Sequence, residues 1–180
     1  MKNPILVVSL AVLLCFTFAC QNKAEKAELE KMKAMAQTEE QNKAVVRQFF
    51  EAADAQNVNR LIELLASGAV IHGVVPQEDL TAENAAQFLQ PFYQTFPDLN
   101  HSIEDIFAKG DKVVVRLLIQ ATHKGEFMGI PPTGNRIRYF QMSVIQVVDG
   151  KIKEGWRVTD SLGMMQQLGM ELKPMEAEKK

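Results

Sequence analysis

The chain has 180 residues, of which 20 are Lys or Arg, 22 are Asp or Glu, and 47% are apolar. This apolar content is too high for a disordered chain, and the length suits one domain with its own core rather than two. The balanced charge argues against nucleic acid as a partner, and two cysteines cannot support a disulfide scaffold.

The first twenty residues have the pattern of an export signal. Lys2 precedes an apolar run over residues 5–19. As a helix this run would reach about 22 Å, which is short of the ~30 Å hydrocarbon core of a membrane. A charged start, a short apolar run and a small residue before the cleavage point are typical of a signal peptide, which we predict for residues 1–19.

Residues 17–20, Thr-Phe-Ala-Cys, resemble a bacterial lipobox, in which the cysteine becomes the acylated first residue of the mature chain. The resemblance predicts lipid attachment at Cys20 and leaves no free thiol, because Cys15 departs with the signal. Gln21, where Asp would be the alternative, favours the outer membrane. We expect a cell-envelope protein that the lipid alone holds to the membrane; simple secretion is the alternative.

Residues 20–40 are predicted to be the acylated cysteine and a charged tether. Nine residues between 21 and 40 are charged, and opposite charges three to five positions apart suit a solvated, partly helical spacer. A partner-binding coiled coil would need sustained heptads. Thr38 and Gln41 fit a capping box, which predicts that a domain over residues 41–172 begins here, followed by a charged tail over residues 173–180.

The first half of this domain has helical periodicity. Apolar residues at helical spacing predict two helices within residues 41–68, with a break around residues 57–59. Residues 69–72 form a strand candidate. Thr81 can cap a third helix that ends at Pro97, and Pro91 should kink it.

The second half alternates with a period of two. Between residues 112 and 124 the odd positions are apolar, and further strands are predicted over residues 136–148 and 151–162. Gly110 and the Asp149-Gly150 pair mark hairpin turns. Helices followed by meandering strands predict an α+β domain with an antiparallel sheet covered on one face.

The last predicted strand carries a carboxylate on its apolar face. Alternation from Ile152 places Trp156, Val158 and Asp160 together. A carboxylate there is paired with a cation, is hydrogen-bonded, or has its pKa raised by desolvation. A raised pKa suits a general acid or base, so Asp160 is a candidate catalytic residue; an aspartate that fastens a loop or helix end is the alternative.

The three histidines lie on three separate predicted elements. His123 is the last residue on the apolar face of its strand, His72 ends a strand candidate, and His101 follows residues 97–100. A single histidine on an apolar face is more often a core residue than a catalyst, and the sequence leaves open whether the three converge. No His or carboxylate pair has metal-site spacing, so we predict no metal.

A loop over residues 124–134, which we call the glycine-proline loop, contains apolar side chains that a free loop would not expose. These are Phe127, Met128 and Ile130. We expect them to cover a ligand pocket, a second subunit or the rim of the sheet. A loop packed only on its own domain is the alternative.

Several segments resemble the SnoaL-like polyketide cyclase, or ester cyclase, family. They are Phe96-Pro97-Asp98-Leu99, Ile103-Glu104-Asp105, residues 110–116, the long segment of residues 122–134, residues 149–152, and Trp156-Arg157-Val158-Thr159-Asp160. The match covers about residues 42–170 in family order. It implies a nuclear transport factor 2-like cone, in which a curved antiparallel sheet wraps around three N-terminal helices and leaves a pocket at the open end.

The resemblance also implies a chemistry. Cyclases of the family close a ring by intramolecular aldol chemistry without metal or cofactor, and an aspartate in the last strands acts as acid and base. The matching position is Asp160, with His123 as its pocket companion. We add His72, Phe127, Met128 and Trp156 as residues expected to bind the substrate.

Two classes of function follow. The first is an exported, cofactor-free enzyme of the ester cyclase type that acts on a small apolar carbonyl compound. The second is a non-catalytic lipoprotein whose cone binds a hydrophobic molecule or serves for dimerisation. Val114 and Leu118 alternate with Arg116 and other polar residues on the open face of their strand, so we expect a homodimer there.

Overall fold

The structure is a computed structural model that describes residues 4–75 and 78–171, with side chains described from residue 23 onward except at residues 74–78. The chain divides into two compact units, Met1–Thr38 and Glu39–Lys180. The side chain of Cys20 and the tail over residues 173–180 lie outside the described parts. Among the described residues, no helix combines the length and the apolar character needed to cross a membrane.

The first unit is helical. The helix α1 (Pro4–Asp54) runs through it without interruption, and the side chains of residues 23–38 are all exposed. The predicted helix start at Thr38 is wrong. Thr38 lies inside α1, where its hydroxyl donates to the carbonyl oxygen of Ala34, 3.0 Å away, so it bonds back into the helix instead of capping a new one.

Three helical segments of the second unit support the sheet. The end of α1 buries Val46, Phe49 and Phe50. The helix α2 (Val58–Leu64) follows the predicted break, and the side chain of its N-cap Asn57 accepts a hydrogen bond from the backbone of Arg60. The helix α3 (Ala85–Thr95) accommodates Pro91.

The sheet has six strands in the described residues. They are β1 (Leu65–Val75), β2 (Glu78–Thr81), β3 (Asn100–Lys109), β4 (Lys112–Thr122), β5 (Arg136–Val148) and β6 (Lys151–Thr159). Their order is β2-β1-β6-β5-β4-β3. All neighbours are antiparallel except β1 and β6, which are parallel. The prediction of a wholly antiparallel sheet is therefore wrong for this pair. The long chain segment between β1 and β6 is the crossover connection that parallel strands require.

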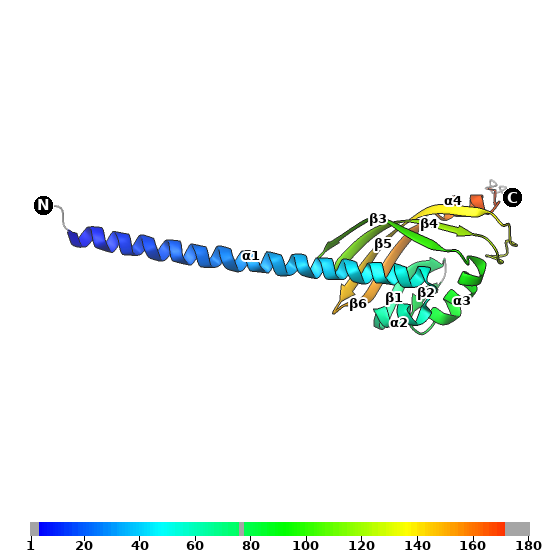
Figure 1. Ribbon diagram of the computed structural model, residues 1–180, viewed down its shortest axis with the longest axis horizontal. Coiled ribbons are helices and arrows are strands. Elements are labelled where there is room, and N and C mark those ends of the chain that lie inside the picture. The colour runs from blue at the N-terminus through cyan, green and yellow to red at the C-terminus, as the bar shows by residue number, and fades with distance from the viewer. Residues whose placement is uncertain (1–3, 76–77, 172–180) are drawn as a thin grey trace, which may run out of the picture. The chain divides into compact units, whose positions relative to one another are not determined.

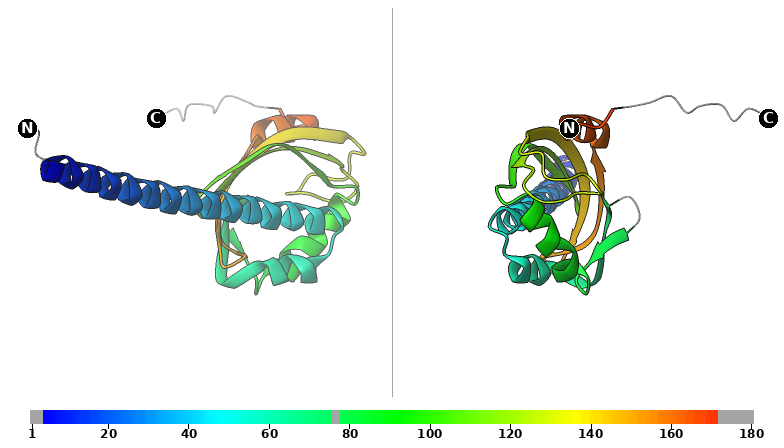
Figure 2. Two further views of the ribbon diagram at one scale, coloured as in Figure 1. Left: turned by 60° about the vertical axis from the view of Figure 1, so that its left-hand side comes forward. Right: turned by 90° about the vertical axis from the view of Figure 1, so that its right-hand side faces the viewer.

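The sheet curves around the helices of the second unit (Figure 1, Figure 2). The predicted alternation on β4 is confirmed, since Val113, Val115 and Leu117 on its inner face are 0% exposed. The α+β architecture of helices within a curved sheet is thus the predicted one. The last strand ends at Thr159, before the predicted Leu162, and a short helix α4 (Ser161–Gln167) follows.

Candidate active site

A cavity of about 670 Å³ lies between the helices and the inner face of the sheet. This volume falls within the range of small-molecule sites. Most of its wall is apolar, and five phenylalanines contribute to it: Phe49, Phe50, Phe88, Phe92 and Phe127. A ligand that fills the cavity must therefore offer mainly apolar surface.

A β-bulge in β6 decides which side chains of that strand enter the cavity. Ile152 pairs with Val147 of β5, but Glu154 pairs with Gln146, so Lys153 is an extra residue. One extra residue reverses the faces of the strand beyond it. After the bulge the odd positions face inward, and Arg157 and Thr159 line the cavity; Val158 also belongs to the lining, although it is 75% exposed.

Arg157 is the cation in the wall of this cavity. Its Nε is buried and has no hydrogen-bond partner, and no described carboxylate lies within ion-pair distance of it. The residue as a whole is half-buried, and desolvation lowers the pKa of Arg157 to about 10. The guanidinium therefore stays charged at neutral pH.

Two tyrosines stand near Arg157 in the cavity wall. Burial raises the pKa of Tyr93 to about 12, and the negative charge of Asp54 acts in the same direction. Burial also raises the pKa of Tyr139 to about 12. Both phenols therefore keep their protons, and the buried hydroxyl of Tyr93 has no partner among the described residues. They can donate hydrogen bonds to a ligand.

An acid–base pair joins the end of α1 to the start of β3. His101 lines the cavity, and its Nδ1 lies 2.6 Å from Oδ1 of Asp54. Asp54 also accepts the backbone N–H of His101, at 3.0 and 3.1 Å. A carboxylate at Nδ1 places the proton of a neutral imidazole there and leaves Nε2 as the basic nitrogen.

A short polar strip continues along the sheet from this region. The hydroxyl of Thr159 donates to Gln141, and Gln141 donates to Ser143 at 3.2 Å. Gln141 is 4% exposed and lines the cavity. The strip gives one wall of the cavity a polar character that a purely apolar ligand would leave unused.

The predicted placement of Asp160 on the core face is wrong. Asp160 is exposed and does not line the cavity, and its side chain caps α4 by accepting the backbone N–H of Gly163 at 2.9 Å. The bulge at Lys153 is the physical reason, because it shifts the alternation on which the prediction depended. The alternative reading, an aspartate that fastens a helix end, is the one observed.

His123 is a core residue in the structure. It is 0% exposed, stacks on Phe96, and does not line the cavity. Its Nδ1 accepts the backbone N–H of Thr133 at 3.3 Å and lies 3.0 Å from the hydroxyl of that residue. The expectation that His123 and Asp160 share the pocket is therefore wrong, because neither residue lines the cavity. His123 instead holds the end of the glycine-proline loop.

The four predicted substrate-binding residues separate into two groups. Phe127 and Met128 of the glycine-proline loop line the cavity. His72 and Trp156 lie outside it, side by side on neighbouring strands, with ring centroids 5.8 Å apart. Trp156 is 40% exposed because the bulge turns it outward, and Lys112 lies over its ring. Their predicted place in the pocket is wrong.

The glycine-proline loop covers the cavity from the side of α3. Phe127 packs against Phe92 and Phe96. The backbone of Lys124 donates to the carbonyl oxygen of Thr95 at 2.8 Å, and the hydroxyl of Thr95 donates to that of Glu126. The loop thus covers a cavity, as expected from the sequence, and a contact with a second subunit stays a prediction.

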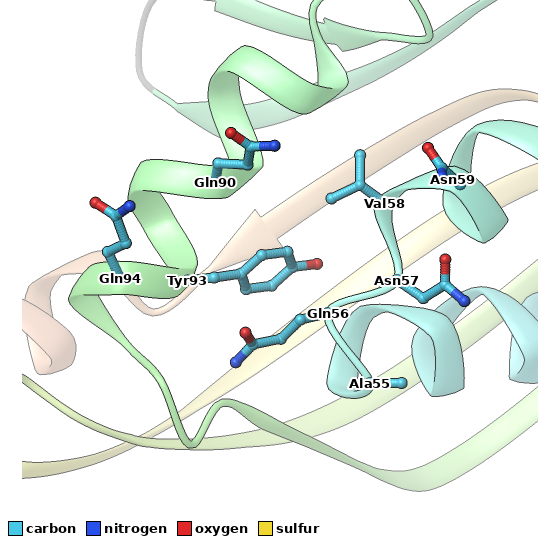
Figure 3. Close-up of a pocket in the computed structure, with 8 residues that line it drawn as sticks. All are labelled: Ala55, Gln56, Asn57, Val58, Asn59, Gln90, Tyr93 and Gln94. Atoms are coloured by element: carbon cyan, nitrogen blue, oxygen red, sulfur yellow. The ribbon is translucent and has the colours of Figure 1, made fainter.

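A second depression lies where the link between α1 and α2 approaches α3 (Figure 3). Amide side chains dominate its wall: Gln56, Asn57, Asn59, Gln90 and Gln94. Figure 3 shows the ring of Tyr93 projecting from α3 toward the link. Since Tyr93 is the titratable residue in this wall and has a pKa of about 12, the depression offers no acid or base near neutral pH.

The described residues contain no cluster of three or more His, Cys, Asp or Glu side chains suited to a metal ion. The polar groups that do converge are those of the cavity: the Asp54–His101 pair, the two tyrosines and Arg157. Of these groups the sequence indicates only His101, as one of three histidines whose convergence it leaves open.

The family model described as SnoaL-like polyketide cyclase matches residues 43–168. Aklanonic acid methyl ester cyclase DnrD of Streptomyces peucetius is 38% identical over 60 residues, which are 33% of this chain and 41% of that protein. Nogalonic acid methyl ester cyclase of Streptomyces nogalater is 34% identical over 61 residues, or 34% of this chain and 46% of that protein. The matched segment spans less than half the length of either relative.

Solved structures match over a larger share of the chain. AclR of Streptomyces galilaeus is 27% identical with a TM-score of 0.64, and the match covers 75% of this chain and 97% of AclR. IdmH of Streptomyces antibioticus is 32% identical with a TM-score of 0.63, over 72% of this chain and 99% of IdmH. A SnoaL-like protein of Jannaschia sp. CCS1 has a TM-score of 0.65 at 25% identity, over 74% and 95%. These neighbours confirm the predicted nuclear transport factor 2-like fold.

Proposed function

The chain belongs to the SnoaL-like polyketide cyclase family, and on that premise we propose that its cavity carries out ester-cyclase-type acid–base chemistry on a small apolar carbonyl compound. The observation that carries the proposal is the Asp54–His101 pair: His101 lines the apolar cavity, and Asp54 engages its Nδ1. The role of general base thus falls on His101 instead of Asp160.

The reaction begins with a proton transfer. Nε2 of His101 removes a proton from the carbon next to a carbonyl group, and Asp54 stabilises the imidazolium that forms. Negative charge then develops on the carbonyl oxygen. Tyr93, Tyr139 and Arg157 supply donors for it in a cavity of low dielectric, where fixed donors are most effective.

Ring closure follows as an isomerisation, in which the product keeps every atom and electron of the substrate. The enolate carbon attacks a second carbonyl group of the same molecule and forms the new carbon–carbon bond, while the alkoxide takes the proton from the His101 imidazolium. All of these steps use side chains alone. The two relatives named above are methyl ester cyclases of aklanonic acid and nogalonic acid, which supports a ring-closing reaction of this kind.

Deuterium exchange tests the proton transfer without knowledge of the natural substrate. We expect the chain in D₂O to accelerate exchange at the carbon next to the carbonyl of 2-tetralone, as followed by mass spectrometry. His101→Gln should lower the accelerated rate by roughly 10²–10⁴, and Asp54→Asn should lower it as well. Asp160→Asn is the control and should leave it unchanged.

Two outcomes of the exchange experiment would contradict parts of this proposal. If the unmodified chain binds the ketone but leaves its exchange at the uncatalysed rate, the non-catalytic binding module becomes the better account. If exchange is accelerated and His101→Gln leaves it unchanged, the assignment of the base is wrong.

We also propose that the chain is exported and held in the cell envelope by a lipid on Cys20, as the lipobox-like residues 17–20 predict. The unmodified chain should then fractionate with membranes, and Cys20→Ala should release it into the soluble fraction. Mass spectrometry of the N-terminal peptide checks the modification. An unmodified, soluble wild-type chain would contradict the proposal.

A further inference from the structure

Arg157 brings a positive charge into the apolar cavity, and the described residues do not neutralise it. Other arginines form salt bridges with carboxylates, such as Arg60 with Glu63 and Arg116 with Asp105, both at exposed sites. Arg157 has no such partner among the described residues, although its Nε is buried and desolvation lowers its pKa. A positive charge in this position is unfavourable unless an anion pairs with it.

The other groups of the cavity do not supply the missing anion. Tyr93 and Tyr139 are neutral, because burial raises the pKa of each to about 12. Asp54 is engaged by His101. Glu126 lies in the lining, but it is an exposed residue of the glycine-proline loop and does not bond to Arg157. Arg157 therefore has no anionic partner among the described residues of the cavity, although it lies next to aromatic walls.

The geometry points to a ligand with an ionised carboxylate: we propose that the cavity binds an aromatic or similarly flat apolar carboxylic acid as the free acid, with the carboxylate on Arg157. A guanidinium can donate two parallel hydrogen bonds to a carboxylate, which an ester cannot accept with the same strength. The buried hydroxyl of Tyr93 supplies a further unpartnered donor near the same charge.

This inference deepens the proposed function and rests on it only in taking the cavity as the ligand site. It separates this chain from its two named relatives, which are cyclases of methyl esters. The apolar body of the acid would lie among the phenylalanines, and His101 of β3, engaged by Asp54 of α1, would face it.

A comparison of 2-naphthoate with methyl 2-naphthoate tests the charge directly. Both probes have the same ring system, and calorimetric titration of the full chain in lipid nanodiscs, with empty nanodiscs as the blank, gives both affinities. We expect the acid to bind about tenfold more tightly than the ester, or better. Equal affinities, or no binding of either probe, would overturn the proposal.

Variants assign the preference to one residue. Arg157→Met removes the charge at similar length and should bring the affinity ratio of acid to ester to about one. Arg47→Met removes an exposed arginine of α1 and should leave the ratio unchanged. A preference that survives in Arg157→Met would show that another group binds the carboxylate, and the proposal would be wrong.

Two further measurements keep the test decisive. If Arg157→Met does not fold, Arg157→Lys replaces it: the charge remains but the two-pronged donor is lost, so the ratio should fall while staying above one, and an unchanged ratio rejects the proposal. His101→Gln should leave the ratio unaltered. If the unmodified chain shows the acid preference but does not accelerate deuterium exchange, the enzyme proposal alone is rejected.

Discussion

His72 lies between two carboxylates on the outer side of the sheet. Its Nδ1 is 2.9 Å from Asp79 and its Nε2 is 3.2 Å from Glu154. The hydrogen bond to Glu154 is the main cause that raises the pKa of His72 above 6.5, and Asp79 adds to it. The charged imidazole therefore bridges β2, β1 and β6.

This bridge predicts a pH-dependent contribution to stability. Because the folded-state pKa of His72 is raised, the contribution is fully present below about pH 6.5 and is lost as the pH rises through the folded-state value. His72→Gln should lower Tm by about 1–3 °C at pH 6 and by less at pH 8.5. Thermal unfolding at the two pH values checks this, and an equal or larger effect at pH 8.5 would contradict it.

Asp160 is predicted to stabilise α4 and to have no part in the cavity chemistry. Its side chain caps the helix through the backbone N–H of Gly163. Asp160→Ala should cost about 1 kcal/mol of unfolding free energy, whereas Asp160→Asn retains a capping oxygen and should cost little. Urea unfolding gives both values. A stable Asp160→Asn variant that loses deuterium exchange would instead return Asp160 to the catalytic site.

At the scale of elements, the contact between β1 and β6 holds Arg157 in place. Gly73 has a φ of +75°, and a Cβ there would lie only 2.5 Å from the backbone oxygen of Arg157. Gly73→Ala must therefore separate the two strands or strain them. It should destabilise the fold by roughly 2–4 kcal/mol and weaken the acid preference of the cavity.

Gly68 provides the matched control for this prediction. Its φ of +69° is nearly the same, but a Cβ would meet nothing within 4 Å. Gly68→Ala should therefore show only the backbone cost, about 1–2 kcal/mol, with no effect on the cavity. If chemical denaturation gives the same loss for both variants, the close contact at Arg157 does not matter for stability.

The elements that follow a simple period were predictable, and the cavity side chains of β6 were not. The alternation on β4 gave its inner face correctly because no bulge interrupts its pairing with β5. In β6 the extra residue Lys153 reverses the faces, and nothing in the local sequence distinguishes a bulge from continued alternation. Simple alternation from Ile152 places Arg157 on the face opposite to Trp156 and Val158, which the sequence makes the outer one.

The Asp54–His101 pair was hidden from the sequence for a different reason. The two residues are 47 positions apart, and their contact depends on how the end of α1 meets the start of β3. A single sequence carries no signal for such a contact. The covering role of the glycine-proline loop was predictable, because Phe127 and Met128 are apolar residues in a segment whose glycines and prolines exclude a core element.

For the whole molecule, the outer side of the sheet carries an apolar surface that the described residues leave uncovered. We call it the outer patch: Phe140, Met142, Val144, Trp156 and Val158, which are between 38% and 75% exposed. Strand pairing places these side chains next to one another, since Val144 faces Trp156 and Met142 faces Val158. A continuous apolar patch on the open face of a sheet favours a protein interface.

We propose that two copies of the chain associate through the outer patch. A two-fold axis across the sheet would bring each patch against its copy and bury apolar side chains that are otherwise in water. Arg116, which lies over the ring of Phe140, and Lys112, which lies over Trp156, would lie at the edge of the interface.

Sedimentation of the Glu39–Lys180 unit should show a dimer at tens of micromolar. Val158→Lys should shift it to the monomer, because a charge at the most exposed position of the patch would have to be buried unpaired. Leu162→Lys, at an exposed apolar residue of α4 outside the patch, should remain dimeric, and a wild-type unit that sediments as a monomer would exclude this interface.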